Sequence, residues 1–356
     1  MLEALARISS GRRLSSGDEQ DALDELECNE CWQPLFRYLD QALATGGQSL
    51  PSHYQRLIRL RLSYFEDIST AQALASDMIR RCHLDFSSFR DALLNEQVIP
   101  GAEAGHEAAL LEAATEAFSA RSERVQAFEK LAAVYEKRLF NEVRLQQVFE
   151  RLIQLDPDNI KALRYFKLAF SQNNDWEQVA RILKRLIEVV QTRPEKFRLA
   201  HDLAYSLVYH LNQPRDAILV LDRHCKDSPL DVSQIEFDAA YRLGDLDRCI
   251  KVMQLALSSV RDDAGKAILQ FRTADLFRKS GKPRECEKSL RESLATWQVF
   301  LDPFEPIIQL QIDEKRWVHV AASLRALALR VQDKELVDQI QQAVRRIEAG
   351  LDDQST

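Results

Sequence analysis

Residues 176–183, WEQVARIL, recur 141 positions later as residues 317–324, WVHVAASL. Both copies begin with a tryptophan, Trp176 and Trp317, have Val-Ala at the fourth and fifth places, and end in leucine. The separation is close to four times 35 residues, and a fixed period of that length predicts stacked structural repeats in which each repeat covers the apolar face of the next. Repeats of this kind place function on an extended surface rather than in a catalytic pocket.

Two apolar positions in this stretch, four residues apart, follow the same period along the chain. The first is taken by Leu145, Val179, Ala217, Cys249, Cys286 and Val320, in steps of 34, 38, 32, 37 and 34. The second is taken by Phe149, Leu183, Leu221, Met253, Leu290 and Leu324. Residues four apart lie on one face of an α-helix, so this stripe predicts the buried face of one helix in each of six repeats.

A helix with a different signature precedes the stripe in each repeat. It carries a large residue, a leucine followed by a small residue, and an aromatic residue. The clearest example is Phe128, Leu131, Ala132 and Tyr135. The same spacing is found in Leu163, Phe166, Lys167 and Phe170, and again in Ala200, Leu203, Ala204 and Leu207. The small residue lets two helices approach closely, and the aromatic side chain fills the space beside it.

Prolines and polar residues mark the helix ends. Pro157 and Pro229 follow the stripe, where a proline cannot continue the helix. Asp158 and Asn159, after the first of these prolines, are good N-caps for the next helix. Turns inside the repeats are expected at residues 173–174, 212–213, 244–245 and 281–282. Each repeat is therefore expected to be a helix, a turn and a second helix.

The composition supports an all-α fold. Leu, Ala, Arg, Glu and Gln dominate, all of them helix formers, and there are only 10 Gly and 10 Pro in 356 residues. The alternation that marks β-strands is nearly absent. No stretch approaches the roughly 18 apolar residues that a membrane-spanning helix needs. The net charge of −7 disfavours nucleic acid as a general partner, because such partners require an excess of Lys and Arg.

This pattern resembles the tetratricopeptide repeat (TPR), a 34-residue helix–turn–helix. The resemblance covers about residues 122–331, as about six repeats, and implies a right-handed α-α superhelix of the TPR-like solenoid type. It also implies a concave groove, lined by the first helix of each repeat, in which partner segments bind. Some repeats depart from the pattern. Glu236 and Phe237 replace the Leu-small pair in repeat 4, Lys167 takes the small position in repeat 2, and Pro303 and Pro306 begin repeat 6.

Three regions are predicted along the chain. Residues 1–105 contain ten Arg, no Lys and sixteen acidic residues, and form helices expected at 18–27, 31–43, 54–65, 71–81 and 86–94. They are either degenerate repeats or a small bundle. Residues 106–331, which begin with a helix expected at 106–118, form the TPR-like array. Residues 332–356 provide a capping helix, at 334–350, and a disordered tail. The boundary near 100–122 coincides with the change in charge and with Pro100 and Gly101.

The groove of repeats 2 and 3 is the best candidate for a partner-binding site. If these repeats follow the geometry of the family, cations and aromatics point inward together. The predicted groove residues are Lys161, Arg164, Gln172, Arg198, His201, Tyr205 and Tyr209, beside Leu168 and Ser171. Such a surface suits an acidic or carboxylate-terminated peptide, through charge-assisted hydrogen bonds. The alternative is that they are ordinary solvated side chains on a scaffold.

Other motifs predict no catalytic centre, cofactor or metal. Cys28 and Cys31 have a redox or metal-type spacing, but no second such pair follows, so a plain helical pair is expected. The seven histidines form no metal-binding motif, and no glycine-rich phosphate loop or nucleophile elbow is present. Cysteines at small apolar positions suit a reducing compartment. The acidic run 18–30, with seven carboxylates in thirteen residues, is either a solvated helix face or a contact for a basic partner or the chain's own groove.

The sequence therefore predicts a non-enzymatic, cytoplasmic adaptor that binds protein partners in its groove, and leaves a homo-oligomer open. One alternative is a regulatory or sensor subunit of a separately encoded enzyme or signalling complex. Another is an RNA-binding helical-repeat protein, which the acidic net charge disfavours.

Overall fold

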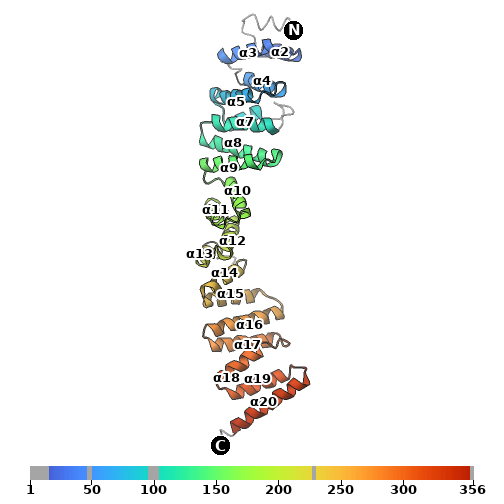
Figure 1. Cartoon of the computed structure of the whole chain (residues 1–356), viewed down its shortest axis with the longest axis vertical. Helices are drawn as coiled ribbons and strands as arrows, with labels where there is room; N and C mark the ends of the chain where they lie inside the picture. The colour runs from blue at the N-terminus through green and yellow to red at the C-terminus, as the bar shows by residue number, and fades with distance from the viewer. Residues whose placement is uncertain (1–15, 46–49, 95–103, 227–229, 353–356) are drawn as a thin grey trace. The chain divides into compact units, whose positions relative to one another are not determined.

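A computed structural model describes residues 16–45, 50–94, 104–226 and 230–352. Within these ranges the chain forms nineteen α-helices and one π-helical turn, and no β-strand (Figure 1). The prediction of an all-α fold is confirmed. Pro229, which was expected to close a repeat, lies outside the described residues, as do Pro100 and Gly101 and the end of the predicted tail.

The chain divides into two compact units, between Phe166 and Lys167. The N-terminal unit contains α2 (Ser16–Cys28), α3 (Trp32–Thr45), α4 (Leu50–Ser63), α5 (Ile68–Cys82), α6 (Phe86–Leu93), α7 (Ala104–Ala117), α8 (Arg121–Val134), the π-helical turn η1 (Tyr135–Leu139) and α9 (Glu142–Leu155). The division falls inside α10 (Ile160–Gln172). The region boundaries predicted at 105/106 and 331/332 stay predictions.

The C-terminal unit continues the alternation of helices and short turns. Its helices are α11 (Trp176–Val189), α12 (Arg193–Tyr209), α13 (Pro214–His224), α14 (Ser233–Leu243), α15 (Leu246–Ser259), α16 (Asp263–Lys279), α17 (Pro283–Thr296), α18 (Phe304–Asp313), α19 (Trp317–Ala328) and α20 (Lys334–Asp352). Every consecutive pair from α11 to α20 packs together. The predicted capping helix is α20, which covers α19 with the buried side chains of Ile340 and Val344.

One kind of turn joins the two helices of a hairpin. In the turn before α11, Asn174 has a positive φ of 58°, and the backbone N–H of Asp175 donates to the carbonyl of Phe170 at 2.9 Å. This is a Schellman closure of the first helix. The Asp175 side chain then accepts from the N–H of Gln178 and caps the second helix. The residues with positive φ at this position are Glu30, Glu66, Phe140, Asn174, Asn212, Gly244, Gly281 and Lys315.

The turns predicted at residues 173–174, 212–213, 244–245 and 281–282 are therefore confirmed. Glu30 and Glu66, 36 residues apart, place the same turn in the region before residue 106. Asn159 acts as expected at the start of α10, where its side-chain oxygen accepts from the N–H groups of Lys161 and Ala162 at 3.1 Å. Pro157 lies in the connection between α9 and α10.

Most of the residues that define the repeats are buried. Phe128, Leu131, Ala132, Tyr135, Phe149, Leu183, Ala217 and Leu221 each expose less than a tenth of their surface, as do Cys225, Cys249 and Cys286. Phe166 and Phe170 are partly buried. Trp176 stacks on His210 with a ring separation of 3.6 Å, and Trp317 is 38% exposed. The period in the sequence thus identified the packed face of the hairpins.

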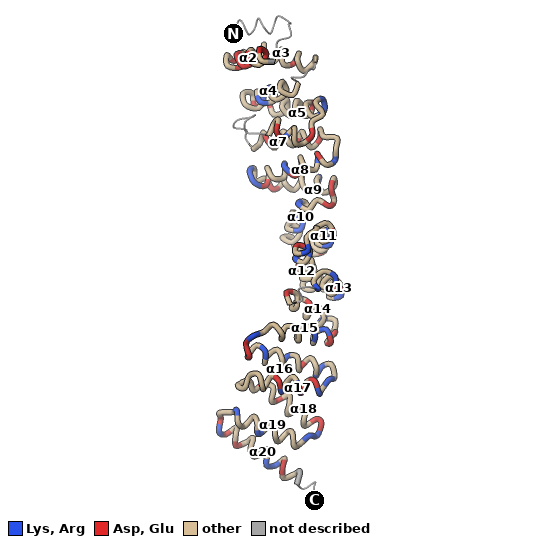
Figure 2. The backbone as a smooth tube through the Cα atoms, turned by 180° about the vertical axis from the view of Figure 1, so that it is seen from behind, with Lys and Arg blue, Asp and Glu red and all other residues tan. Residues whose placement is uncertain are grey.

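Three of the seven carboxylates in the acidic run 18–30, Glu19, Asp24 and Glu27, are held by side chains of their own unit. Figure 2 colours the Asp and Glu positions of α2 red. Glu19 accepts from the Tyr38 hydroxyl at 2.6 Å, and Glu27 accepts from Arg59 at 2.6 Å. The buried Arg56 pairs with both Asp24 and Glu27. The run therefore fixes α2 against α3 and α4, a third outcome beside the solvated face and the partner contact that the sequence suggested.

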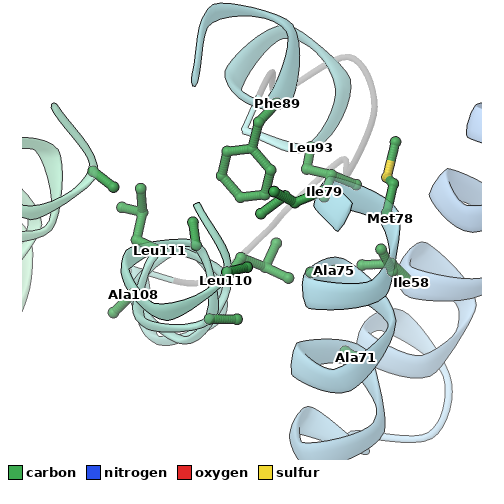
Figure 3. Close-up of a cluster of buried hydrophobic side chains, with 14 of the residues drawn as sticks. Ile58, Ala71, Ala75, Met78, Ile79, Phe89, Leu93, Ala108, Leu110 and Leu111 are labelled. Atoms are coloured by element: carbon green, nitrogen blue, oxygen red, sulfur yellow. The ribbon is translucent and has the colours of Figure 1, made fainter. Parts of the chain in front are cut away.

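The N-terminal unit has one continuous apolar core. It extends from Ala22 in α2 to Ala162 at the start of α10, and so crosses residue 105 without a break. Figure 3 shows part of it, where Phe89 and Leu93 of α6 face Ile79 of α5, beside Leu110 of α7. The helices α5, α6 and α7 can pack together here because each presents aliphatic or aromatic side chains at helical spacing.

Candidate partner-binding cleft

The first helices of three successive hairpins, α14, α16 and α18, line an open cleft of about 820 Å³ in the C-terminal unit. The second helices α15 and α17 contribute to its floor. Side chains at three- and four-residue spacing reach the cleft from each first helix, because such positions share a helix face. They include Gln234, Phe237 and Tyr241 of α14, Arg272, Asp275 and Lys279 of α16, and Glu305 and Gln309 of α18.

Aromatic and aliphatic side chains form the floor of the cleft. The rings of Phe237 and Tyr241 lie 6.0 Å apart and nearly parallel, and Met253 and Phe271 lie beside them. Tyr241 is 49% exposed. Phe237 occupies the position where the repeat pattern has a small residue, whereas the equivalent residue of the next hairpin is Ala274. The departure in repeat 4 therefore adds an aromatic surface to the cleft.

The rim of the cleft carries both charges that are paired with one another and charges that are not. Asp275 accepts from Arg278 at 2.6 Å and lies 2.9 Å from the Lys279 ammonium, so these three charges largely satisfy one another. The hydrogen bond from Arg278 lowers the pKa of Asp275, although burial acts in the opposite direction. Lys279 also lies over the Tyr241 ring, 5.7 Å from its centre, in a cation–π arrangement.

Arg272 and Glu305, in contrast, form no side-chain hydrogen bond or ion pair with any residue in the part of the chain that the structure describes. Both are exposed and both line the cleft. Unpaired charges beside an apolar floor can engage a ligand without first breaking an internal pair. Arg272 is therefore the group best placed to meet a carboxylate, and Glu305 a cation.

A second hollow of about 670 Å³ adjoins the cleft along α18. The two share Phe271, Glu305, Pro306 and Gln309, so they form one extended groove. Pro306 is one of the prolines that interrupt the pattern at the start of repeat 6. Phe304 and Leu301 line the far part, and Arg330 lies over the Phe304 ring at 5.3 Å.

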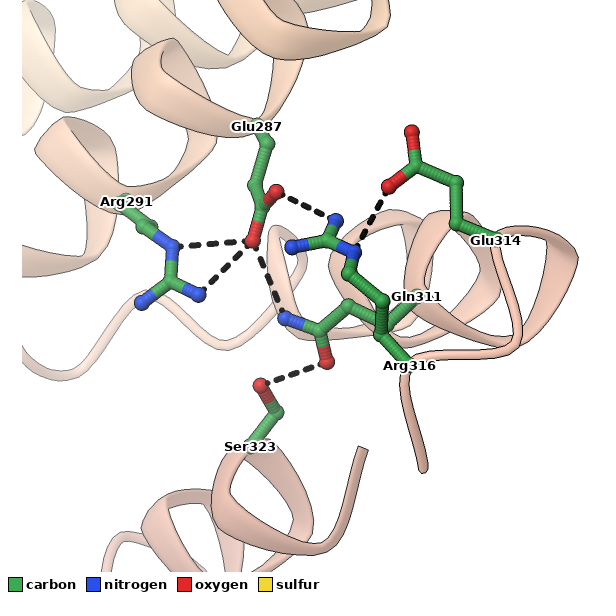
Figure 4. A network of polar contacts seen from close by, with 6 residues as sticks. All are labelled: Glu287, Arg291, Gln311, Glu314, Arg316 and Ser323. Atoms are coloured by element: carbon green, nitrogen blue, oxygen red, sulfur yellow. Dashed lines mark hydrogen bonds and ion pairs between the residues drawn. The ribbon is translucent and has the colours of Figure 1, made fainter. Parts of the chain in front are cut away.

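A polar network joins α17, α18 and α19 (Figure 4). Glu287 of α17 accepts from Arg316 at 2.6 Å, from Arg291 at 2.7 Å and from the buried Gln311 of α18 at 3.2 Å. The hydroxyl of Ser323 in α19 donates to Gln311 at 3.0 Å. Burial alone would raise the pKa of Glu287, but the bonds from Arg316, Arg291 and Gln311 outweigh it and lower that pKa to about 2.

The cysteines and histidines do not form an obvious reactive centre. Burial raises the pKa of the Cys286 thiol, below the cleft, to about 11, so it stays protonated at neutral pH. Cys28 ends α2, while Cys31 lies in the connection before α3, so the helical pair expected from the sequence is wrong. The turn at Glu30, with φ of 54°, separates them. Within the described ranges, no three His, Cys, Asp or Glu side chains gather as a metal site would require.

The predicted groove residues fall in both units. Lys161 and Arg164 belong to the N-terminal unit, where Lys161 pairs with Glu129. Gln172, Arg198, His201, Tyr205 and Tyr209 belong to the C-terminal unit. Lys167, at the small position of repeat 2, pairs with Asp202 at 2.7 Å and ties α10 to α12.

On α12, Tyr205 and Tyr209 lie 4.7 Å apart, and the Tyr209 hydroxyl donates to Asp238 of α14. Burial, with this bond, raises the pKa of Tyr209 to about 12. Tyr209 therefore serves to join two first helices, while Tyr205 is 46% exposed. The α14–α18 cleft includes none of the groove residues that the sequence predicted. Its only signal was the set of departures at Phe237 and Pro306.

None of the described helices has both the length and the apolar character of a membrane span. The sequence matches no family model. No curated protein matches it either.

Several solved proteins resemble the chain in their arrangement of helices. YrrB, described as a TPR protein with an unusual peptide-binding site, is 13% identical with a TM-score of 0.34, over 56% of this chain and 98% of YrrB. A tetratricopeptide repeat protein from Parabacteroides merdae is 12% identical with a TM-score of 0.31, over 68% of this chain and 93% of that protein. Yeast Tom70 is 13% identical with a TM-score of 0.29, over 98% of this chain and 80% of Tom70.

None of these TM-scores reaches 0.5, and the similarities identify no specific protein. The hairpins themselves, with their repeated turn and their period of buried residues, show an all-α helical-repeat fold.

Proposed function

We propose that the protein is a non-enzymatic interaction scaffold that binds a segment of a partner protein in the cleft on α14, α16 and α18. The observation that carries the proposal is an aromatic floor, formed by Phe237, Tyr241 and Phe271, beside the unpaired charge of Arg272. Clefts of several hundred Å³ with an apolar lining and a few polar groups are typical ligand sites. Burying an aromatic or aliphatic side chain on this floor would supply most of the affinity.

The charges of the cleft indicate the chemistry of the partner segment. Arg272 favours a carboxylate, and a guanidinium can hold it with two parallel hydrogen bonds. Asp275 is already satisfied by Arg278 and Lys279, so it repels an incoming carboxylate less than a free aspartate would. We therefore propose an acidic or carboxylate-terminated segment with a large apolar side chain close to its charged group.

We also keep the predicted groove residues as secondary partner contacts, Lys161 and Arg164 within the N-terminal unit and Gln172, Arg198, His201, Tyr205 and Tyr209 within the C-terminal unit. Among them, Arg198 is exposed and forms no ion pair with the described residues, and Tyr205 offers an exposed ring. Lys161 and Tyr209 are held by Glu129 and Asp238 and contribute less. The six free cysteines favour a reducing compartment, and we propose that the scaffold acts in the cytoplasm.

Site-specific photocrosslinking tests the location of binding. Tyr241 is replaced by p-benzoylphenylalanine in the full-length protein, and Phe140 is replaced in the same way as a matched control. Phe140 is an exposed aromatic residue, at 79%, and lies in the N-terminal unit outside the cleft. In cells, we expect a discrete protein adduct from position 241 and none of the same size from position 140. Mass spectrometry of the adduct then identifies the partner segment, which is synthesised for titration.

Charge reversal then tests the chemistry. Arg272→Glu should weaken binding of the synthetic segment about tenfold, which corresponds to roughly 1.4 kcal/mol. Because Arg272 is exposed and has no partner in the described structure, the variant should fold normally. Equal adducts at positions 241 and 140, or unchanged affinity in the Arg272→Glu variant, would reject the cleft as the site.

A further inference from the structure

A separate hollow of about 530 Å³ lies in the C-terminal unit between α11, α12 and α13. It shares no residue with the α14–α18 cleft and includes none of the predicted groove residues. Its lining combines cations with aliphatic side chains. The residues are Lys184, Ile187 and Glu188 of α11, Lys196 and Leu203 of α12, and Leu219, Val220, Arg223 and His224 of α13.

The charges around this hollow are unbalanced. Lys184, Lys196 and Arg223 form no side-chain hydrogen bond or ion pair with the residues that the structure describes. The only acid in the lining, Glu188, already has a cation nearby, because the Arg185 guanidinium lies 3.3 Å from its carboxylate. Three cations converging on one concave surface repel one another and raise the local positive potential. An anionic ligand would relieve this repulsion.

The pKa of His224 is affected by the same positive charges. Burial, followed by the nearby charges of Arg223 and Lys196, lowers its pKa from the ordinary value. The ring therefore stays uncharged at neutral pH and can take part in hydrogen bonding. Figure 2 shows in blue the Lys and Arg positions of α11 and α13.

The apolar part of the lining indicates an extended ligand rather than a single small anion. Leu219 is 66% exposed at the edge, above the buried side chains of Ile187 and Leu203. A single exposed leucine is common on protein surfaces. An exposed leucine surrounded by three unpaired cations, in a concave surface, matches a segment that alternates acidic and apolar side chains.

We propose that this hollow binds an acidic segment of a separate protein, with an apolar side chain placed against Leu219 and carboxylates facing Lys184, Lys196 and Arg223. The chain's own acidic run on α2 is a poor occupant, since Glu19, Asp24 and Glu27 are already bonded to Tyr38, Arg56 and Arg59. The C-terminal unit then carries two independent binding surfaces, which would allow it to hold two partners at once.

The probe is a fluorescein-labelled peptide of alternating glutamate and leucine, titrated with the full-length protein at low ionic strength. We expect the double variant Lys184→Glu/Arg223→Glu to weaken binding at least about tenfold, because two attractive contacts become repulsive. The matched control is Arg181→Glu/Arg215→Glu. It makes the same change in charge on the same two helices, at exposed positions outside the hollow, and should retain the affinity.

Three results would overturn the proposal. One is an equal loss of affinity in the control, which would show a general charge effect. Another is displacement of the peptide by inorganic phosphate at a similar concentration, which would show a small-anion site. The third is unchanged binding in Leu219→Ser. This variant removes the apolar contact, so unchanged binding would show that the contact contributes nothing. Arg272→Glu should leave this binding intact, so failure here is distinguishable from failure of the α14–α18 cleft.

Discussion

Glu287 shows how a single carboxylate can join three helices. It accepts hydrogen bonds from Arg291 of α17, Gln311 of α18 and Arg316 at the start of α19. Because its pKa in the folded protein is about 2, below the ordinary 4.5, its contribution to stability is complete above about pH 5. That contribution is lost progressively as the pH falls from about 5 to about 2, where the carboxylate becomes protonated in the folded protein.

We expect Glu287→Gln to lower the stability of the C-terminal unit at pH 7 by roughly 2 kcal/mol, because the partly buried carboxylate and its partners form one network. The variant should also lose less stability than the wild type between pH 5 and pH 2. Hydrogen exchange of the α18 and α19 amides measures this locally. Parallel acid profiles for the two proteins would contradict the role of Glu287.

The thiols provide a second test. Cys28 is exposed, whereas Cys225, Cys249 and Cys286 are buried, and burial raises the pKa of each of these three to about 11. A thiol-disulfide reagent should therefore label Cys28 quickly, and the three buried cysteines only after unfolding. Cys28→Ser should remove the fast phase. Rapid labelling of Cys249 in the native protein would show that the helices open far more readily than their packing indicates.

The sequence predicted the burial of Cys249 and Cys286 because both occupy the small position of the apolar stripe. It could not predict which charges are free. Lys161 and Arg272 are both basic residues, and nothing in the sequence distinguishes them. In the structure Lys161 pairs with Glu129, whereas Arg272 has no partner among the described residues. That difference depends on which side chains the fold brings across from the neighbouring helices.

The turn inside each hairpin is the recurring element of the fold. Its αL residue is glycine at Gly244 and Gly281, with φ near 73°, but is a non-glycine residue such as Asn174 or Lys315 elsewhere. Glycine adopts positive φ without the steric cost that a side chain brings. The polar pairs in the sequence, Lys315-Arg316 among them, were therefore reliable turn signals.

Opposite substitutions at two of these turns should have opposite effects. Gly244→Ala should destabilise by about 1 kcal/mol from backbone strain alone, since no heavy atom lies within 4 Å of the added Cβ. Lys315→Gly should stabilise by about 0.5 kcal/mol, because the exposed lysine has no side-chain partner among the described residues. Denaturant unfolding of the C-terminal unit measures both. A change of the same sign in the two variants would contradict this account.

The chain as a whole contains two units, each with its own apolar packing. The core from Ala22 to Ala162 lies in the N-terminal unit, and smaller clusters around Leu290 and Cys249 lie in the C-terminal unit. Units with separate cores can unfold separately. We expect two transitions in tryptophan fluorescence, with the signal of the N-terminal unit lost in Trp32→Phe. One transition, unchanged in that variant, would show that the chain unfolds as a single body.

The repeat period predicted the fold class and the buried stripe, but it could not place the division at residues 166–167. The boundary predicted near residue 105 was based on a change in the charge of the sequence. The division between the two units depends instead on which helices pack together. The cleft was also hidden, because Phe237 and Pro306 looked like lapses in a pattern. In the folded protein these departures supply surface that a regular repeat would not have.

Calorimetric titration of the segment that crosslinks at position 241 is the decisive measurement. The segment should bind the wild type and a control variant, Arg181→Glu, with the same Kd, because Arg181 is an exposed cation that does not line the cleft. It should bind Arg272→Glu about tenfold more weakly, a difference of roughly 1.4 kcal/mol. If all three proteins bind it equally, the α14–α18 cleft is not the surface through which this protein recognises its partner.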